Sequence, residues 1–164
     1  ISDTEIEEIV HAIANAINNS GIKDPLFISV LNGSFMFSSD IMRKITIPDT
    51  EISFIKLSSY SGTETTGKVS ELIGIEGNIS GRNIVILEDI IDTGITLEKI
   101  ISLLKKEEVA DIKVATLLFK PDAYTKDIHI DFIGKSIPND FVVGYGLDYD
   151  EIGRNLPHIY KLKN

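Results

Sequence analysis

Apolar residues recur along the chain in two patterns, one typical of helices and one typical of buried strands. Near the start, apolar residues from Ile6 to Ile17 recur at the spacing of an amphipathic helix. Ser2 and Glu5 stand just before them at the spacing of a capping box, which marks a helix start. We therefore predict a helix that ends in the Asn-Asn-Ser-Gly stretch at residues 18–21.

The rest of the chain repeats a unit of strand, tight loop and helix. Short apolar runs predict strands, and periodic apolar residues after two of these runs predict helices. The predicted strands cover residues 26–31, 52–57, 84–89, 114–119, 132–133 and 141–143, and the predicted helices cover residues 35–42 and 97–104. Strands that alternate with helices predict an α/β fold, with a mainly parallel central sheet flanked by helices on both faces. In such folds the site lies along the carboxyl ends of the strands.

The length and composition limit the class of protein. The chain has 164 residues, which predicts a single domain over residues 1–164 with one site. Hydrophobic residues make up 43% and charged residues 25%, a balance that excludes a disordered chain. The sequence contains no cysteine, which excludes disulfides, thiolate metal sites and cysteine nucleophiles. The histidines, His11, His129 and His158, form no metal-binding motif.

Charge and hydropathy indicate the partners and the compartment. The formal net charge is −9, which argues against nucleic-acid binding, because that binding needs an excess of Lys and Arg on one face. No apolar run approaches the ~18–20 residues that cross a bilayer, and the first residues are acidic, unlike a secretory signal. We therefore expect a cytoplasmic protein that binds small molecules and neither nucleic acid nor membranes.

Two carboxylates stand where the predicted strand at residues 84–89 ends. Glu88 and Asp89 follow an apolar run, and burial of an ionised carboxylate without a partner is costly. We therefore predict that both face water or a ligand. The segment from Thr93 to Thr96 then opens a helix, whose first N–H groups have no partner within the helix. Such a helix end binds phosphate, and acids beside it are suited to ribose hydroxyls, a Mg²⁺ ion or a proton.

This segment has other interpretations. One is that Asp92 and Thr93 are only helix N-caps and that the preceding acids form a solvated strand end. The triplet at residues 92–94 also matches the active site of aspartic proteases, but those enzymes need two facing aspartates in an all-β fold. Phospho-receiver domains have an acidic pair after the first strand, where this chain has Leu-Asn-Gly. Neither of these two protein classes fits the context.

The segment from Val85 to Thr96 resembles the phosphoribosyl-pyrophosphate-binding motif of type I phosphoribosyltransferases. The chain from about Leu26 to Leu162 is similar to the hypoxanthine and hypoxanthine–guanine members of that family. The segments that carry this similarity are Val30-Leu31-Asn32-Gly33-Ser34, Ser59-Tyr60, Leu117-Leu118-Phe119-Lys120-Pro121, and residues 141–149 and 154–157. The resemblance implies the type I phosphoribosyltransferase fold, with a small hood region and a mobile active-site loop at residues 58–68.

The resemblance also implies a reaction and the residues that carry it. The reaction is Mg²⁺-dependent transfer of the 5-phosphoribosyl group from phosphoribosyl pyrophosphate to N9 of hypoxanthine or guanine, in purine salvage. The implied general base is Asp92. The implied phosphoribosyl-binding residues are Glu88, Asp89, Asp92, Thr93, Gly94, Ile95 and Thr96, and the implied purine-binding residues are Lys120, Phe141 and Val142. The implied pyrophosphate-binding residues are Leu31, Asn32, Gly33, Ser59, Tyr60 and Arg154, and the implied metal-binding residues are Glu88, Asp89 and Asp148.

Three of these residues have structural alternatives. Lys120 would otherwise be a surface lysine at a strand end, and Phe141 would be a core aromatic. Arg154 would otherwise only pair with Asp148 or Asp150 across the surface. The order of all three along the chain, together with the phosphate motif, favours the functional roles.

The sequence departs from the family pattern at two positions. Position 32 usually carries a basic residue that is joined by a cis peptide bond to the residue before it, and here it is Asn32. Position 124 is commonly arginine and here it is Tyr124. Both changes remove positive charge from the expected pyrophosphate side, so a catalytically weak, nucleotide-binding regulator of the same family is the alternative function. The resemblance further implies a homo-oligomer, either a dimer or a tetramer.

Overall fold

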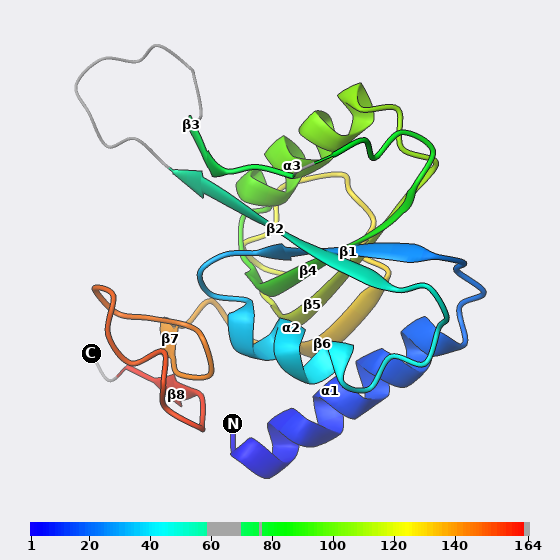
Figure 1. Ribbon diagram of the computed structural model, residues 1–164. Coiled ribbons are helices and arrows are strands. Elements are labelled where there is room, and N and C mark those ends of the chain that lie inside the picture. The colour runs from blue at the N-terminus through cyan, green and yellow to red at the C-terminus, as the bar shows by residue number, and fades with distance from the viewer. Residues whose placement is uncertain (59–69, 76, 163–164) are drawn as a thin grey trace.

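The structure, a computed structural model, describes residues 1–58, 70–75 and 77–162. Within these residues the centre is a six-stranded sheet in the order β3-β2-β1-β4-β5-β6 (Figure 1). The strands are β1 (Pro25–Val30), β2 (Glu51–Ser58), β3 (Ser70–Ile73), β4 (Asn83–Ile91), β5 (Asp111–Phe119) and β6 (Phe132–Ser136). Neighbouring strands are parallel except β2 and β3, which are antiparallel. The prediction of a mainly parallel sheet is confirmed.

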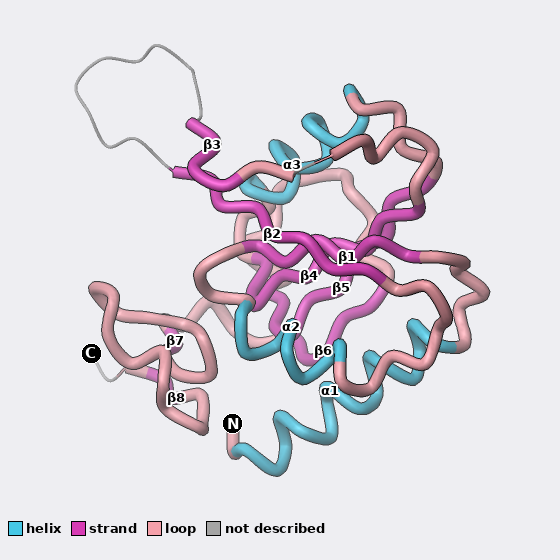
Figure 2. The backbone as a smooth tube through the Cα atoms, viewed as in Figure 1, coloured by secondary structure: helices cyan, strands magenta, loops and turns pink. Residues whose placement is uncertain are grey.

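Helices cover both faces of this sheet (Figure 2). α1 (Asp3–Asn18) and α2 (Phe35–Met42) lie together on one face, and α3 (Ile95–Lys106) lies on the other. Successive strand residues point to opposite faces, so each central strand contributes to both layers. In β1, Phe27 belongs to the core beside α1 and α2, whereas Ile28 belongs to the core beside α3.

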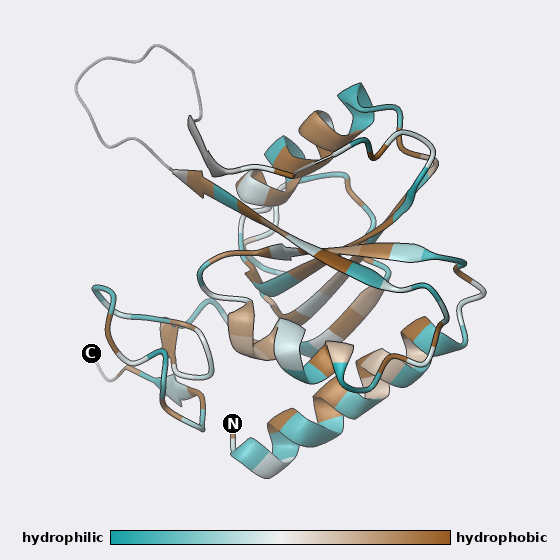
Figure 3. Cartoon of the chain, viewed as in Figure 1, coloured by the Kyte–Doolittle hydropathy of each residue, from teal (hydrophilic) through white to brown (hydrophobic). Residues whose placement is uncertain are grey.

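The helices α1 and α3 are held to the sheet by their apolar faces. The buried apolar residues are Ile6, Val10, Ile13, Ala14 and Ile17 in α1, and Leu97, Ile100, Ile101 and Leu104 in α3. Figure 3 shows hydrophobic residues along the central strands and alternating with hydrophilic residues along both helices. Each buried Ile or Leu side chain contributes roughly 1.5–3 kcal/mol, so these faces are sufficient to hold the helices. As predicted, Ser2 caps α1, and its hydroxyl accepts a hydrogen bond from the Glu5 N–H at 3.2 Å.

A small second sheet forms a hood near the carboxyl ends of the central strands. β7 (Val142–Val143) pairs antiparallel with β8 (Tyr160–Lys161). The N-terminus lies beside this sheet (Figure 1), because Ile1 and Ile159 exchange two backbone hydrogen bonds, at 2.8 and 3.0 Å. The first and last parts of the described chain therefore meet in the hood.

Parts of the fold differ from the prediction. The pattern does not predict β3 or β8, because neither Ser70–Ile73 nor Tyr160–Lys161 is an apolar run or a clear alternation. β4 continues to Ile91, beyond the predicted end at Asp89, because it stays paired with β5 as far as Phe119. The loop expected to be mobile, at residues 58–68, lies outside the described residues except for Ser58, which ends β2. No helix in the described part of the chain has the length and hydrophobicity needed to cross a membrane.

Candidate active site

The carboxyl ends of β1, β4 and β5 lie side by side, and the predicted site residues gather at this edge of the sheet. Ile91 of β4 is opposite Phe119 of β5, so the residues that follow, Asp92 and Lys120, are neighbours. β1 pairs with the other side of β4, which brings the loop after β1 to the same place. Parallel pairing thus joins three segments that are distant in the sequence.

The loop after β4 has the geometry of a phosphate-binding site. α3 begins at Ile95, and its N-cap is Gly94, whose φ of +82° lies in the left-handed region that glycine adopts easily. Thr93, Ile95 and Thr96 are exposed around the first N–H groups of this helix. The end of β4 and this loop line a cavity of about 100 Å³. The interpretation of Asp92 and Thr93 as helix N-caps is therefore wrong, since glycine occupies the cap and no described side chain closes the helix end.

Glu88 and Asp89 are buried, so of the two predicted surroundings, water or a ligand, exposure to water is wrong and contact with a ligand stays a prediction. Their exposed fractions are only 5% and 9%, because β4 continues past them and stays paired with its neighbours. Burial raises the pKa of Glu88 well above its usual range, and the charge of Asp89 raises it further. Burial also raises the pKa of Asp89 to about 6, although two backbone N–H groups and Arg154 act in the opposite direction. A ligand that donates hydrogen bonds here would stabilise the ionised carboxylates.

Asp92 and Lys120 form an ion pair between the ends of β4 and β5. The Lys120 Nζ donates a hydrogen bond to Asp92 Oδ2 at 2.9 Å. Lys120 is 7% exposed, so the alternative of a surface lysine is wrong, whereas the Asp92 side chain is partly open to solvent. The pair places a hydrogen-bond donor beside a carboxylate that can accept a proton.

Arg154 reaches from the hood toward the buried acids. Its Nη1 donates to the Gly146 carbonyl at 2.8 Å, and its Nη2 pairs with Asp148 Oδ1 at 2.7 Å. The pairing with Asp148 that the structural alternative expects is therefore present. Arg154 and Asp148 also lie close enough to Asp89 to act on its pKa, Arg154 lowering it and Asp148 raising it. The hood thus brings both charged residues to the edge of the site.

Asp89 and Asp148 supply the oxygen donors that Mg²⁺ prefers. Asp148 Oδ2 also accepts a hydrogen bond from the Glu151 N–H at 2.9 Å. Among the described residues no three Asp, Glu or His side chains gather into a group that could hold a metal alone. Mg²⁺ at phosphate sites is usually held by one or two carboxylates together with substrate phosphates, and these residues fit that type of binding.

The loop after β1 is packed between β4 and the hood. The peptide bond between Leu31 and Asn32 is cis, as the resemblance implies for this position. A Cβ atom at Gly33 would overlap the carboxylate of Asp89, and a Cβ atom at Gly146 would overlap the Gly33 carbonyl oxygen. Only glycine fits at these two positions, so the backbone of this loop passes directly beside the acids.

Phe141 presents an aromatic ring at the surface of the hood. It is 55% exposed, so the alternative of a core aromatic is wrong. Its ring lies 5.8 Å from that of Tyr149 with an interplanar angle of 86°, an edge-to-face contact, and Val142 follows it in β7. Tyr149 lies in the segment at residues 141–149 that carries the resemblance, but the sequence assigns it no role, because its contact with Phe141 depends on how the hood folds. The predicted residues Ser59 and Tyr60 lie outside the described residues.

The sequence matches the phosphoribosyl transferase domain family over residues 2–150. The chain belongs to the phosphoribosyltransferase family. It is 41% identical over 167 residues to a hypoxanthine-guanine phosphoribosyltransferase of Staphylococcus epidermidis, covering 99% of this chain and 92% of the relative. A crystal structure of a hypoxanthine phosphoribosyltransferase from Staphylococcus aureus has a TM-score of 0.90 and 38% identity, covering 99% of this chain and 89% of that one. A hypoxanthine-guanine phosphoribosyltransferase from Bacillus anthracis has a TM-score of 0.90 and 40% identity, covering 99% and 96%.

The two departures from the phosphoribosyltransferase pattern have different surroundings. Asn32 lies at the cis peptide bond next to Gly33, within the candidate site. The Tyr124 hydroxyl instead donates to the Ile128 carbonyl at 2.8 Å, and its ring lies 5.3 Å from that of Phe119. Tyr124 therefore has a packing role, and its hydroxyl is engaged within its own segment.

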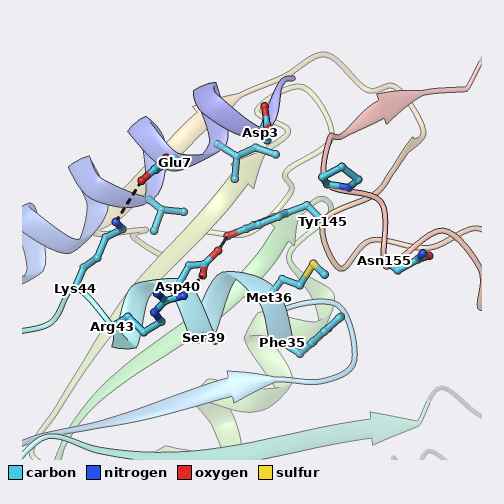
Figure 4. A pocket seen from close by; sticks show the side chains of 13 residues that line it. Asp3, Glu7, Phe35, Met36, Ser39, Asp40, Arg43, Lys44, Tyr145 and Asn155 are labelled. Carbon is cyan, nitrogen blue, oxygen red and sulfur yellow. Dashed lines mark hydrogen bonds and ion pairs between the residues drawn. The ribbon is translucent and has the colours of Figure 1, made fainter.

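A larger groove of about 670 Å³ lies apart from this candidate active site, between α1, α2 and the hood (Figure 4). Tyr145 points across it and donates a hydrogen bond to Asp40 of α2 at 2.6 Å. Burial and the Asp40 carboxylate raise the pKa of Tyr145. Lys44 and Glu7 form a pair at 3.9 Å along the same groove. None of the predicted site residues lines this groove. Several of the predicted residues instead line the smaller cavity after β4, so cavity size does not identify the site in this protein.

Proposed function

We propose that the chain is a hypoxanthine-guanine phosphoribosyltransferase of purine salvage. It transfers the 5-phosphoribosyl group of phosphoribosyl pyrophosphate to N9 of hypoxanthine or guanine and releases pyrophosphate. The observation that carries this proposal is the Asp92–Lys120 pair next to a phosphate-binding loop. The names of the relatives from S. epidermidis and B. anthracis support the same reaction.

The loop from Thr93 to Thr96 binds the 5′-phosphate in this proposal. First-turn N–H groups and the positive end of the helix dipole attract the anion, and the two threonine hydroxyls add donors. Glu88 and Asp89 accept hydrogen bonds from the 2′- and 3′-hydroxyls of the ribose. These charge-assisted bonds offset the cost of ionising two carboxyls whose pKa values burial has raised.

Lys120 and Asp92 form hydrogen bonds with the edge of the purine. Lys120 donates to the 6-oxo oxygen, and Asp92 accepts the proton at N7. As N9 bonds to C1′, the bond from C1′ to the pyrophosphate oxygen breaks, and the proton that the purine loses moves to Asp92. Phe141 stacks on the base, and the backbone of Val142 contacts its edge.

A positively charged side chain and metal-binding carboxylates lie where the negative charge of the leaving pyrophosphate would be neutralised. Asp89 and Asp148, with Glu88 beside them, would hold Mg²⁺, which neutralises part of that charge when bound. Arg154 contacts the pyrophosphate from its place beside Asp148. The loop at Asn32 offers neutral donors on the same side, and Ser59 and Tyr60 are the further predicted contacts.

An absorbance assay of nucleotide formation tests this function. With phosphoribosyl pyrophosphate and Mg²⁺, we expect hypoxanthine and guanine to be converted to IMP and GMP. Rates measured for xanthine in the same assay show which of the three bases the enzyme prefers. A chain that binds IMP but forms no nucleotide from any of these bases would be the nucleotide-binding regulator instead. The neutral residues Asn32 and Tyr124 are the observation that favours this second candidate.

The assembly and location of the protein are part of the proposal. We expect residues 1–164 to form one domain that assembles into a homo-oligomer, a dimer or a tetramer, and this expectation rests on the family resemblance. Size-exclusion chromatography with light scattering gives the number of subunits. Fractionation of cells that produce the tagged chain tests the proposed cytoplasmic location.

A further inference from the structure

The carbonyl group of Thr93, in the phosphate-binding loop, is held by a residue outside that loop. Thr125 donates two hydrogen bonds to this oxygen, from its backbone N–H at 3.3 Å and from its hydroxyl at 3.2 Å. Thr125 lies in the segment that follows β5. The contact therefore connects the loop after β4 to the segment after β5.

The contact with Thr125 also fixes the orientation of the peptide group between Thr93 and Gly94. The one cis peptide bond found among the described residues joins Leu31 to Asn32. The Thr93–Gly94 peptide bond is therefore trans. In a trans peptide the carbonyl of one residue and the N–H of the next point in opposite directions. A Thr93 carbonyl that points to Thr125 therefore directs the Gly94 N–H away from it. Thr93 and Gly94 line the cavity of about 100 Å³ and Thr125 does not, so the Thr93 carbonyl points to a residue outside the cavity.

Two neighbours of Thr125 support the same part of the loop. A Cβ atom at Gly94 would lie 2.5 Å from the Tyr124 ring and 2.8 Å from the Lys126 stem, so the loop backbone passes directly against both side chains. The Lys126 ammonium also pairs with Glu98, in the first turn of α3, at 2.7 Å. Residues 124–126 therefore form a brace along the loop, outside the cavity.

We infer that Thr125 is a positioning residue for the 5′-phosphate. Its two donors fix the Thr93–Gly94 peptide, so the Gly94 N–H is aimed at the phosphate before the ligand binds. This inference rests on the proposed function. A preorganised donor needs no reorientation on binding, so its loss weakens the phosphate contact and leaves the purine contacts unchanged.

Binding of IMP to three variants tests the inference. Thr125→Val removes the hydroxyl and keeps the shape, and Thr125→Ser restores the hydroxyl. We expect calorimetry to show an IMP affinity about fivefold lower for Thr125→Val, which is about 1 kcal/mol, and within about twofold of the parent for Thr125→Ser. Thr50→Val is the matched control, because the Thr50 hydroxyl donates to the Ile47 carbonyl at 2.7 Å, before β2, and its loss should leave IMP affinity unchanged. The KM for hypoxanthine should not change in any of them.

The Gly94 amide resonance in nitrogen-15 NMR separates positioning from a general structural role. Inorganic phosphate should shift this resonance in the parent, and Thr125→Val should move its position before phosphate is added. Equal IMP affinity of parent and Thr125→Val, or an equal loss in Thr50→Val, would overturn the inference. If IMP binding depends on Thr125 but hypoxanthine is not converted, the inference stands and the proposed function fails. A parent that binds no IMP overturns both.

Discussion

Replacement of Asp89 by asparagine should stabilise the ligand-free chain, although it removes a residue of the proposed site. In the unfolded chain this carboxyl ionises near its ordinary pKa of 3.8, whereas burial raises its pKa to about 6 in the folded chain. The folded chain therefore binds more protons between these pH values, and the free energy of unfolding falls as pH rises through them. The difference corresponds to about 3 kcal/mol above pH 6. Asparagine is a weaker acceptor for the backbone N–H groups, so we expect a net gain of about 1–3 kcal/mol.

Thermal and urea unfolding of parent and Asp89→Asn between pH 4 and pH 8 measures this effect. For a domain of this size the gain corresponds to a rise in Tm of about 3–10 °C. The two proteins should be equally stable near pH 4, and the advantage of the variant should be complete above about pH 6. Asp122→Asn, at an exposed position, is the control and should show no such pH-dependent gain. Equal or lower stability of Asp89→Asn at pH 7.5 would refute the reasoning that burial raises this pKa.

Four further substitutions test other parts of the site. Asp92→Asn should keep the fold and lower turnover by roughly 10²-fold or more, and a loss within about threefold would leave Asp92 without a role as general base. Gly33→Ala should destabilise the chain by about 1–3 kcal/mol in urea unfolding and lower activity, because the new Cβ overlaps the carboxylate of Asp89; wild-type stability would contradict this packing. Calorimetry with pyrophosphate and Mg²⁺ should show about ten- to a hundredfold tighter binding for Asn32→Lys and a comparable loss for Arg154→Ala. No gain from Asn32→Lys would show that another group already supplies the charge.

The central part of the fold could be predicted because its strands have strong local patterns. The strands β1, β4 and β5 are nearly continuous apolar runs, as expected for parallel strands that are buried on both faces. The edge strand β3 and the two-residue strand β8 have no such pattern, because their formation depends on a neighbouring strand. The end of β4 was predicted too early for the same reason. Its pairing with β5 carries it past the two acids to Ile91.

The candidate site was predicted as a set of residues, and the structure adds how they contact one another. The Asp92–Lys120 pair follows from the register between β4 and β5, which no local pattern encodes. The raised pKa values of Glu88 and Asp89 depend on burial by neighbouring strands, so charge patterning alone predicts the opposite environment. Thr125 has no sequence signal, because its proposed role depends only on its contact with the Thr93 carbonyl in the loop after β4.

The ratio of kcat/KM for hypoxanthine to that for adenine tests the central claim most directly. The account holds that Lys120 donates to a 6-oxo group beside Asp92. The 6-amino group of adenine would instead place a second donor against this buried donor, so neither would find an acceptor in the other. We therefore expect a preference for hypoxanthine of about 10³-fold or more. Equal kcat/KM values for the two bases, with phosphoribosyl pyrophosphate and Mg²⁺ present, would contradict the claim that this pair reads a 6-oxopurine.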